Sequence, residues 1–351
     1  MSPLAEHLIA RIRGAGPLPV SAYMRLCLLH PEHGYYRTQA PIGAAGDFIT
    51  APEVSQMFGE LIGLWAAELW SLMGRPPRLR LVELGPGRGT LMSDALRAAG
   101  QAAPDFRAAI DLHLVEINPE LRRRQAETLA AAQPRWHDEI AALPAGPAIV
   151  IANEFFDALP VDQIVRTGSG WRQRVIDYAG GRFVFATGRP AEAPAGAAPG
   201  GVYETSPERD DAARGLFLRI ASQGGAALII DYGSVSGLGD TLQAVRGHRK
   251  VDPLADPGLA DLTAHVDFSR FVSLARDAGA VPHGPVPQGA FLSRLGVAAR
   301  AAVLLRTATA AQKRDIEQAM RRLIEPDEMG TLFKALAVTA PGLPVPPGFD
   351  V

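Results

Sequence analysis

A glycine-rich stretch about a quarter of the way along the chain has the composition of a cofactor loop. Residues 81–90 read LVELGPGRGT, with glycine at alternate positions, Gly85, Gly87 and Gly89. The dinucleotide fingerprint needs its third glycine where this chain has Thr90, and the loop also lacks the Gly-Lys-Ser/Thr ending of a P-loop. The loop therefore departs from the patterns that bind NAD and nucleoside triphosphates. A turn that only needs left-handed backbone would explain the same glycines.

The acidic residues around this loop favour S-adenosylmethionine as the ligand. Glu83 ends the predicted strand before the loop, where a carboxylate can face the ammonium and sulfonium charges of that cofactor. The helix start after the loop favours the cofactor's own carboxylate. Glu116 ends the next predicted strand, in HLVEIN, where an acid can accept both ribose hydroxyls; a solvated strand end is the structural alternative. The candidate cofactor residues of this region are Glu83, Gly85, Pro86, Gly87, Gly89, Glu116 and Ile117.

The segment NEFFDALP adds groups that could act on an acceptor. Asn153, Glu154 and Asp157 follow a third predicted strand and would lie near the reacting end of the cofactor. A pair of carboxylates suits a guanidinium, because this planar cation forms forked hydrogen bonds with carboxylates. Such a pair could orient one nitrogen toward a methyl donor and stabilise the shifting charge. Loop capping by Asp157, with core packing by Phe155 and Phe156, is the alternative interpretation. Asn153 is a candidate for both cofactor binding and catalysis.

Alternating strands and helices are predicted to position these side chains. The strands are expected at 79–85, 109–117, 147–153 and 226–233, and the helices between them at 90–99 and 119–132. Continuous apolar strands separated by helices predict an α/β fold with a doubly wound parallel sheet, whose ligands bind at the carboxyl ends of the strands. Three segments joined by glycine turns predict an inserted antiparallel meander: 161–167, 171–179 and 182–187.

The rest of the chain completes a three-part organisation. Residues 3–38 read as helix, turn and helix, and apolar residues spaced by three and four predict a helix from about 55 to 73. Further helices are expected at about 268–278 and 309–324. We predict an N-terminal helical segment with a cofactor-covering loop (1–75), a core (76–160 with 224–351) and an inserted β region that meets the substrate (161–223).

Composition excludes several other classes of protein. The chain has 351 residues and a formal net charge of −2, which supplies no global field for a nucleic acid. The single cysteine, Cys27, excludes an internal disulfide, and the histidines of HPEH lack ligand partners at metal spacing, so no metal site is predicted. We see no bilayer-spanning apolar run and no signal or transit peptide. We expect a bacterial cytoplasmic protein, and favour the mitochondrial matrix less. The oligomeric state is left open.

Several segments together resemble one family. The motifs GDFITAPEVSQMFGE, VELGPGRGTLMSDALR, VEINPELRRRQ, NEFFDALPVDQ, GDTLQAVRGH and PGLADLTAHVDF occur in order, and matching segments run from about residue 20 to 296. They resemble the MidA family, which includes the mitochondrial protein arginine methyltransferase that assists assembly of respiratory complex I. The resemblance implies a class I methyltransferase (Rossmann-like) fold and S-adenosylmethionine as methyl donor. It also implies a protein substrate, a complex I subunit for the mitochondrial members.

The resemblance also adds site candidates. The segment GDFITAPE is expected to fold over the cofactor, so Gly46, Asp47, Thr50 and Glu53 become candidate cofactor residues. His265 in TAHVDF matches the family pattern and could act as a general base or orient the substrate, although a structural hydrogen bond is the commoner role.

Two other functions stay open on the sequence alone. The chain could be an assembly chaperone that binds S-adenosylmethionine only for structure, or a small-molecule methyltransferase with a closed apolar acceptor pocket. An oxidoreductase is disfavoured by the missing third glycine of the dinucleotide fingerprint.

Overall fold

The computed structural model describes residues 2–38, 50–192 and 201–350. By its internal contacts the chain divides into two compact units. The first unit contains Met1–Ile49, Asp157–Asp211 and Val235–Asp267, and the second contains Thr50–Phe156, Ala212–Ser234 and Phe268–Val351. The predicted division into an N-terminal segment, a core and an insert was made by expected function and not by contacts, and it stays a prediction.

A seven-strand path forms the sheet of the second unit, in the order β15-β16-β10-β5-β2-β3-β4. The path from β10 to β4 is parallel, whereas β16 is antiparallel to both of its neighbours, β10 and β15. This is the class I methyltransferase arrangement that the family resemblance implies. The strands are β2 (Leu79–Leu84), β3 (Ile110–Val115), β4 (Arg135–His137), β5 (Ala148–Asn153), β10 (Gly225–Ser234), β15 (Val281–Pro287) and β16 (Phe333–Thr339).

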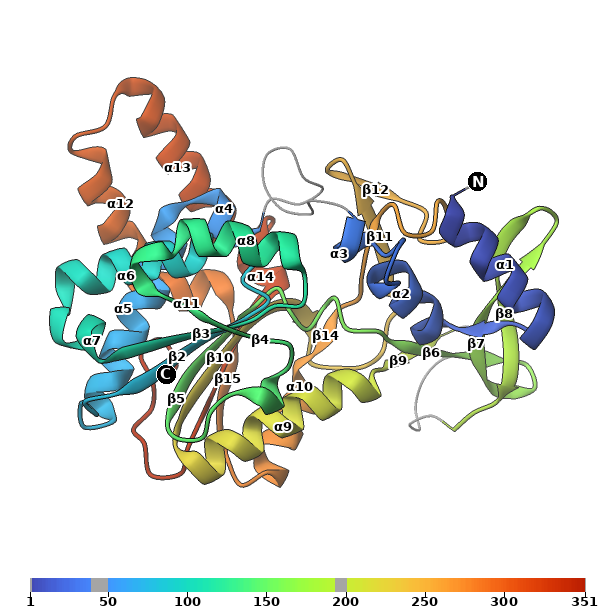
Figure 1. Ribbon diagram of the computed structural model, residues 1–351, viewed down its shortest axis with the longest axis horizontal. Helices are drawn as coiled ribbons and strands as arrows, with labels where there is room; N and C mark the ends of the chain where they lie inside the picture. The colour runs from blue at the N-terminus through green and yellow to red at the C-terminus, as the bar shows by residue number, and fades with distance from the viewer. Residues whose placement is uncertain (1, 39–49, 193–200, 351) are drawn as a thin grey trace. The chain divides into compact units, whose positions relative to one another are not determined.

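Helices cover both faces of this sheet (Figure 1). Helices α5, α6 and α8 lie on one face, and α9 and α10 lie on the other. The pair α12 and α13 forms a hairpin that projects away from the sheet. The helices are α4 (Ala51–Val54), α5 (Gln56–Leu72), α6 (Thr90–Ala102), α7 (Pro104–Ala109), α8 (Pro119–Thr128), α9 (Pro207–Gln223, which begins in the first unit), α10 (Phe268–Asp277), α11 (Gln288–Arg294), α12 (Val297–Leu305), α13 (Ala310–Ile324) and α14 (Met329–Leu332).

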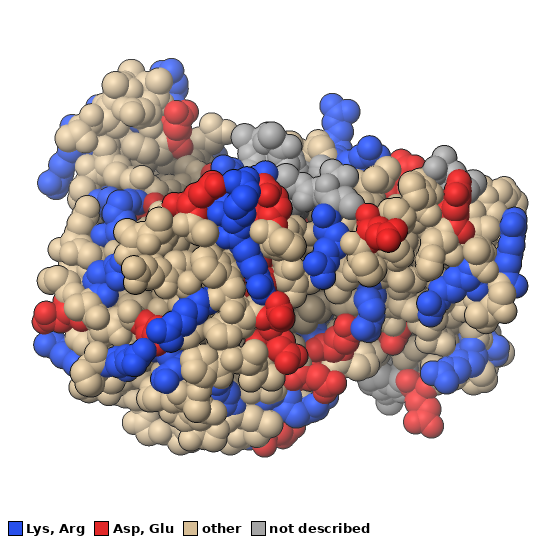
Figure 2. Space-filling view, viewed as in Figure 1, with Lys and Arg blue, Asp and Glu red and all other residues tan. Residues whose placement is uncertain are grey.

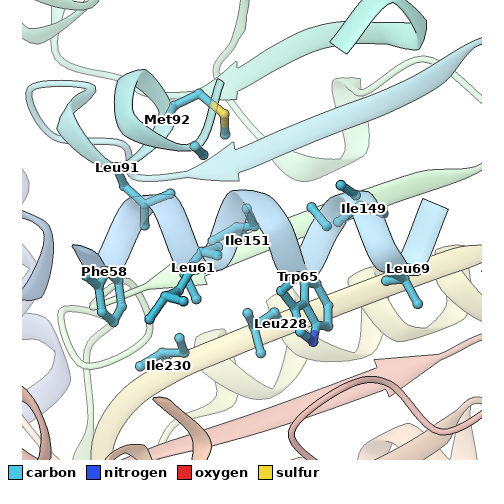
Figure 3. Close-up of a cluster of buried hydrophobic side chains, with 14 of the residues drawn as sticks. Phe58, Leu61, Trp65, Leu69, Leu91, Met92, Ile149, Ile151, Leu228 and Ile230 are labelled. Carbon is cyan, nitrogen blue, oxygen red and sulfur yellow. The ribbon is translucent and has the colours of Figure 1, made fainter. Parts of the chain in front are cut away.

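The predicted helix at 55–73 is α5, and its apolar stripe packs on the sheet. Ser55 caps the helix by accepting the N–H of Met57. Figure 3 shows the stripe facing side chains of β5, β10 and α6. Helix α6 approaches closely at Gly63, where an added Cβ would lie 2.6 Å from the Cα of Ala95. This contact holds α6, the helix that follows the glycine loop, against α5. The residues labelled in the figure are Phe58, Leu61, Trp65, Leu69, Leu91, Met92, Ile149, Ile151, Leu228 and Ile230.

The first unit joins the N-terminal helices to the predicted meander. Helices α1 (Pro3–Ala15) and α2 (Val20–Leu29) share a buried apolar cluster with the sheet strand β7. That sheet has the order β1-β7-β6-β9, with β8 paired to β7. A smaller sheet has the order β12-β11-β13. The remaining elements are α3 (Tyr35–Thr38), β1 (Leu18–Pro19), β6 (Asp162–Thr167), β7 (Gly170–Ala179), β8 (Arg182–Pro190), β9 (Val202–Thr205), β11 (Gln243–Arg246), β12 (Arg249–Val251), β13 (Asp261–Thr263) and β14 (Val266–Asp267).

The structure also contains elements that the sequence pattern did not predict. The long helix α9 lies within the range assigned to the insert, although its start carries a recognisable signal. Ser206 accepts the N–H of Arg209, and Pro207 occupies the first helical position. Strands β15 and β16 were also missed, because each needs a partner from a distant part of the chain.

Candidate active site

The glycine loop connects β2 to α6 through three left-handed residues. The φ angles of Gly85, Gly87 and Gly89 are 60°, 54° and 81°, a region that side chains with a Cβ rarely adopt. Gly85 is also needed for steric reasons, because a Cβ at this position would lie only 2.9 Å from Cδ2 of Phe155. Pro86 closes the turn by accepting the N–H of Gly89 at 2.8 Å. The loop therefore brings bare backbone to the carboxyl end of β2.

Glu83 is a buried acid beside this loop. Its side chain is 3% exposed, and burial raises the pKa of its carboxyl to about 8. Within the ranges that the structure describes, its Oε2 has no hydrogen-bond partner, and neither does Oδ1 of Asn153 at the end of β5. Buried oxygens without partners cost free energy, so both atoms are placed to accept from a bound group that carries donors or positive charge.

Glu116 is held in one orientation by its own turn and by α8. One carboxylate oxygen accepts the N–H of Asn118 at 2.8 Å, and the other accepts Nε2 of Gln125 at 3.3 Å. Burial raises the pKa of the Glu116 carboxyl, while these hydrogen bonds act in the opposite direction. Ile117, the next candidate, has an exposed side chain. The predicted ribose acceptor is thus a braced side chain and not a solvated strand end.

The end of the GDFITAPE motif packs against the glycine loop. Glu53, in α4, accepts Oγ1 of Thr90 at 2.6 Å and pairs with Arg88 at 3.5 Å. On the other side, the N–H of Ala51 donates to Oε1 of Glu154 at 2.9 Å. Thr50 precedes α4, and its carbonyl accepts the N–H of Glu53. Gly46 and Asp47, the other candidates from this motif, lie outside the described residues.

The Glu154 carboxylate accepts hydrogen bonds from neighbouring parts of the second unit. Its backbone has a φ of 49°, which is uncommon for a residue with a side chain. Its Oε1 accepts Nδ2 of Asn153 at 3.2 Å in addition to the N–H of Ala51. One oxygen of this carboxylate therefore holds the start of α4, and the predicted catalytic role of Glu154 stays a prediction.

Asp157 and His265 belong to the first unit, where the side chain of Arg209 binds the backbone of both segments. Arg209 is 5% exposed, and its guanidinium donates to carbonyl oxygens of His265 at 2.8 Å, Ala264 at 3.2 Å and Asp157 at 3.5 Å. The carbonyl of Asp157 also accepts the N–H of Ala264 at 3.0 Å. Two candidates that are 108 positions apart are thus held by their backbones around a single buried cation.

The residues of the second unit fit S-adenosylmethionine on these observations. Glu83 would face its ammonium or sulfonium charge, the glycine loop would approach its methionine portion, and Glu116 would accept its ribose hydroxyls. Comparisons with known proteins lead to the same cofactor. The model of a family of S-adenosyl-L-methionine-dependent methyltransferases matches residues 61–286.

Relatives and solved structures cover nearly the whole chain. The mitochondrial protein arginine methyltransferase NDUFAF7 of Danio rerio is 38% identical over 95% of this chain and 86% of its own length. The human protein of that name is 36% identical over 96% of this chain and 83% of its own length. A crystal structure from Burkholderia thailandensis with bound S-adenosyl-homocysteine has a TM-score of 0.84 and 32% identity, and it covers 99% of this chain and 92% of that one.

The chain belongs to the MidA family of S-adenosylmethionine-dependent methyltransferases. Its cofactor is therefore S-adenosylmethionine, as the MidA-like motifs predict. The animal relatives are mitochondrial by name, and the predicted cytoplasmic location of this member stays a prediction. Among the helices that the structure describes, none combines the length and the apolar character that a bilayer crossing requires.

Some residues of this MidA-family site could not be chosen from the sequence pattern. Gln125 ends the run LRRRQ, which by charge is typical of a solvated helix face. Arg123 and Arg124 do form exposed ion pairs with Glu120, and Figure 2 shows basic and acidic side chains mixed over α8. Gln125 instead points inward and is fully buried. Arg209 was missed with its helix, although the Ser-Pro-Glu start of α9 could have revealed it.

Proposed function

We propose that this enzyme transfers a methyl group from S-adenosylmethionine to an arginine of a protein, and that the protein is a subunit of respiratory complex I. The buried Glu83 carboxyl beside the glycine loop is the observation that carries the methyl-donor half of this proposal. The arginine acceptor is supported by relatives named as protein arginine methyltransferases at 36–38% identity. The complex I subunit follows from the resemblance to the MidA family.

The chain's own residues have distinct tasks in this reaction. The bound cofactor supplies a methyl group on a positively charged sulfur. Glu83, once ionised, holds that charge in place, and Glu116 fixes the ribose, so the methyl carbon is oriented before the acceptor arrives. Asn153 and Glu154, at the carboxyl end of β5, are joined by a hydrogen bond of 3.2 Å and would lie beside the bound cofactor.

The acceptor guanidinium needs an orienting carboxylate and a route for one proton. Asp157 would hold the planar cation by forked hydrogen bonds, which leaves one guanidinium nitrogen available for methylation. The methylated nitrogen then gives up a proton, and His265 or the Asp157 carboxylate would accept it. Because Arg209 binds the backbone of both segments, it would keep these two side chains in register.

Labelled cofactor tests the proposal directly. The purified enzyme would be incubated with methyl-labelled S-adenosylmethionine and complex I subunits isolated from cells that lack it, and methylated arginines would be mapped by mass spectrometry. Asp157→Asn is the matched inactive control. Label on arginine with the wild type alone supports the proposal. Label confined to small molecules would move the assignment to a small-molecule methyltransferase.

The chaperone alternative has its own readout. A variant that cannot bind the cofactor, Glu83→Gln with Glu116→Gln, would be returned to those cells and complex I assembly measured. If assembly is restored without any arginine methylation, the enzyme acts there as a binding protein, and the catalytic proposal is wrong.

A further inference from the structure

Gln125 has a fully buried side-chain amide that makes three hydrogen bonds, two of them to candidate cofactor residues. Its Nε2 donates to the carbonyl oxygen of Gly87 at 2.7 Å and to Oε2 of Glu116 at 3.3 Å. Its Oε1 accepts the indole N–H of Trp136 at 2.8 Å. The side chain therefore joins the glycine loop to the ribose-binding acid, and β4 holds it from behind.

The orientation of this amide is determined by its neighbours. The indole of Trp136 can only donate, so it must face Oε1 of Gln125. The Gly87 carbonyl and the Glu116 carboxylate can only accept, so they must face the two N–H bonds of Nε2. A flipped amide would lose all three hydrogen bonds. Among the uncharged side chains of this length, an amide is the one that satisfies both acceptors and the donor together.

The contact with Gly87 also orients the loop backbone. A trans peptide is planar, and its C=O and N–H point in opposite directions. With the Gly87 carbonyl bound to Gln125, the N–H of Arg88 points away from α8. Glycine has no Cβ to restrict that peptide, so a hydrogen bond to its carbonyl is an effective way to hold it in one orientation.

We propose that Gln125 is a positioning residue for S-adenosylmethionine, which locks the Gly87 peptide and the Glu116 carboxylate into one arrangement before the cofactor binds. This inference rests on the proposed assignment of the glycine loop and Glu116 as the cofactor site. Without the amide, the Gly87 carbonyl would lose this hydrogen bond, and the Glu116 carboxylate would keep its bond from the N–H of Asn118 but lose the one from Nε2. Cofactor binding would then have to order the Gly87 peptide and the second oxygen of Glu116. The loss would fall on cofactor affinity and not on the acceptor.

Gln125→Glu is the sharpest test. It keeps the size of the side chain and the oxygen that accepts from Trp136, but it replaces the donating Nε2 by an oxygen that faces the Gly87 carbonyl and the Glu116 carboxylate. We expect its affinity for S-adenosylmethionine, measured by calorimetry at pH 7.5, to fall about tenfold or more. The difference in affinity between Gln125→Glu and the wild type should be smaller at pH 6, because the protonated carboxyl of the new glutamate can donate a hydrogen bond to one of the two acceptors. KM for the acceptor should not change. The matched control is Gln133→Glu, which adds the same charge at an exposed position after the short 3-10 helix Ala130–Ala132.

A second variant keeps the test decisive if the buried charge prevents folding. Gln125→Met removes the amide without adding charge and should also lose about tenfold in affinity, with a fold checked by circular dichroism. Affinity within twofold of the wild type in either folded variant would overturn the inference. Glu116→Gln distinguishes failure of the cofactor-site assignment from failure of the role proposed for Gln125. If Glu116→Gln also leaves binding unchanged, the site assignment itself is wrong. If it weakens binding while Gln125 variants do not, only the role of Gln125 fails.

Discussion

Replacing Glu83 by glutamine should stabilise the cofactor-free enzyme at alkaline pH while it damages cofactor binding. The pKa of the Glu83 carboxyl is raised from its ordinary 4.5 to about 8 by burial. The folded state therefore holds a proton that the unfolded chain releases above pH 4.5. The stability that depends on this proton is complete below pH 4.5, falls as the pH rises toward 8, and stays constant above that. Glutamine cannot ionise and avoids this loss.

The size of the effect follows from the same two pKa values. The folded pKa of about 8 and the ordinary value of 4.5 differ by about 3.5, which at about 1.4 kcal/mol for each pH unit corresponds to about 5 kcal/mol of stability between pH values well below 4.5 and well above 8. Between pH 6 and pH 8.5, the free energy of unfolding of Glu83→Gln relative to the wild type should rise by about 2.5 kcal/mol. Comparing two pH values cancels the fixed cost of burying an amide. Urea denaturation without cofactor measures this difference, and Glu139→Gln, at an exposed position, is the control.

Cofactor binding gives the opposite response. Only the ionised carboxylate attracts the positive charges of S-adenosylmethionine, so wild-type affinity should rise with pH between 6 and 8, by up to about tenfold per unit. In Glu83→Gln the affinity should be weak and lack this rise. Equal pH dependence of binding in both proteins, or an unfolding difference that does not grow with pH, would refute the assignment of Glu83 as a buried acid that ionises for the cofactor.

Three further outcomes are expected. Asp157→Asn should leave affinity for S-adenosylmethionine within about twofold and reduce methyl transfer by at least about a hundredfold, because an orienting carboxylate is lost; activity near the wild-type level would make Asp157 structural. Arg209→Lys should lower kcat about tenfold with little change in cofactor affinity, because a lysine cannot reach several carbonyls at once; an effect on cofactor binding alone would contradict the proposal that Arg209 positions Asp157 and His265. Burial lowers the pKa values of His113 and His137, which lie 2.9 Å apart between Nδ1 and Nε2. Their contribution to stability should be complete above the ordinary pKa of 6.5 and decline as the pH falls below it. The drop in melting temperature from pH 7.5 to 5.5 should therefore be smaller in His113→Gln than in the wild type.

Local patterns were sufficient for the central part of the fold. The strands that became β5 and β10 contain continuous apolar runs, and those that became β2 and β3 are mostly apolar with polar residues between. Helix α6, between β2 and β3, buries a periodic apolar stripe. Glu83 and Glu116 were predictable because each stands where such a strand ends. Strands β15 and β16 were not, since each is defined by a partner far away in the sequence.

The sequence by itself determined the doubly wound sheet, the glycine loop and the acids at its strand ends, because these depend on periodicity and on residues that are neighbours along the chain. Only the tertiary structure decided which side chains support them. Gln125 reads as part of a charged helix face, and its role depends on Gly87, Glu116 and Trp136 meeting it from three separate segments. Arg209 likewise gains its role from carbonyls that folding brings together. Hydrogen bonds between distant segments depend on where the packed core places them, and no local pattern records that.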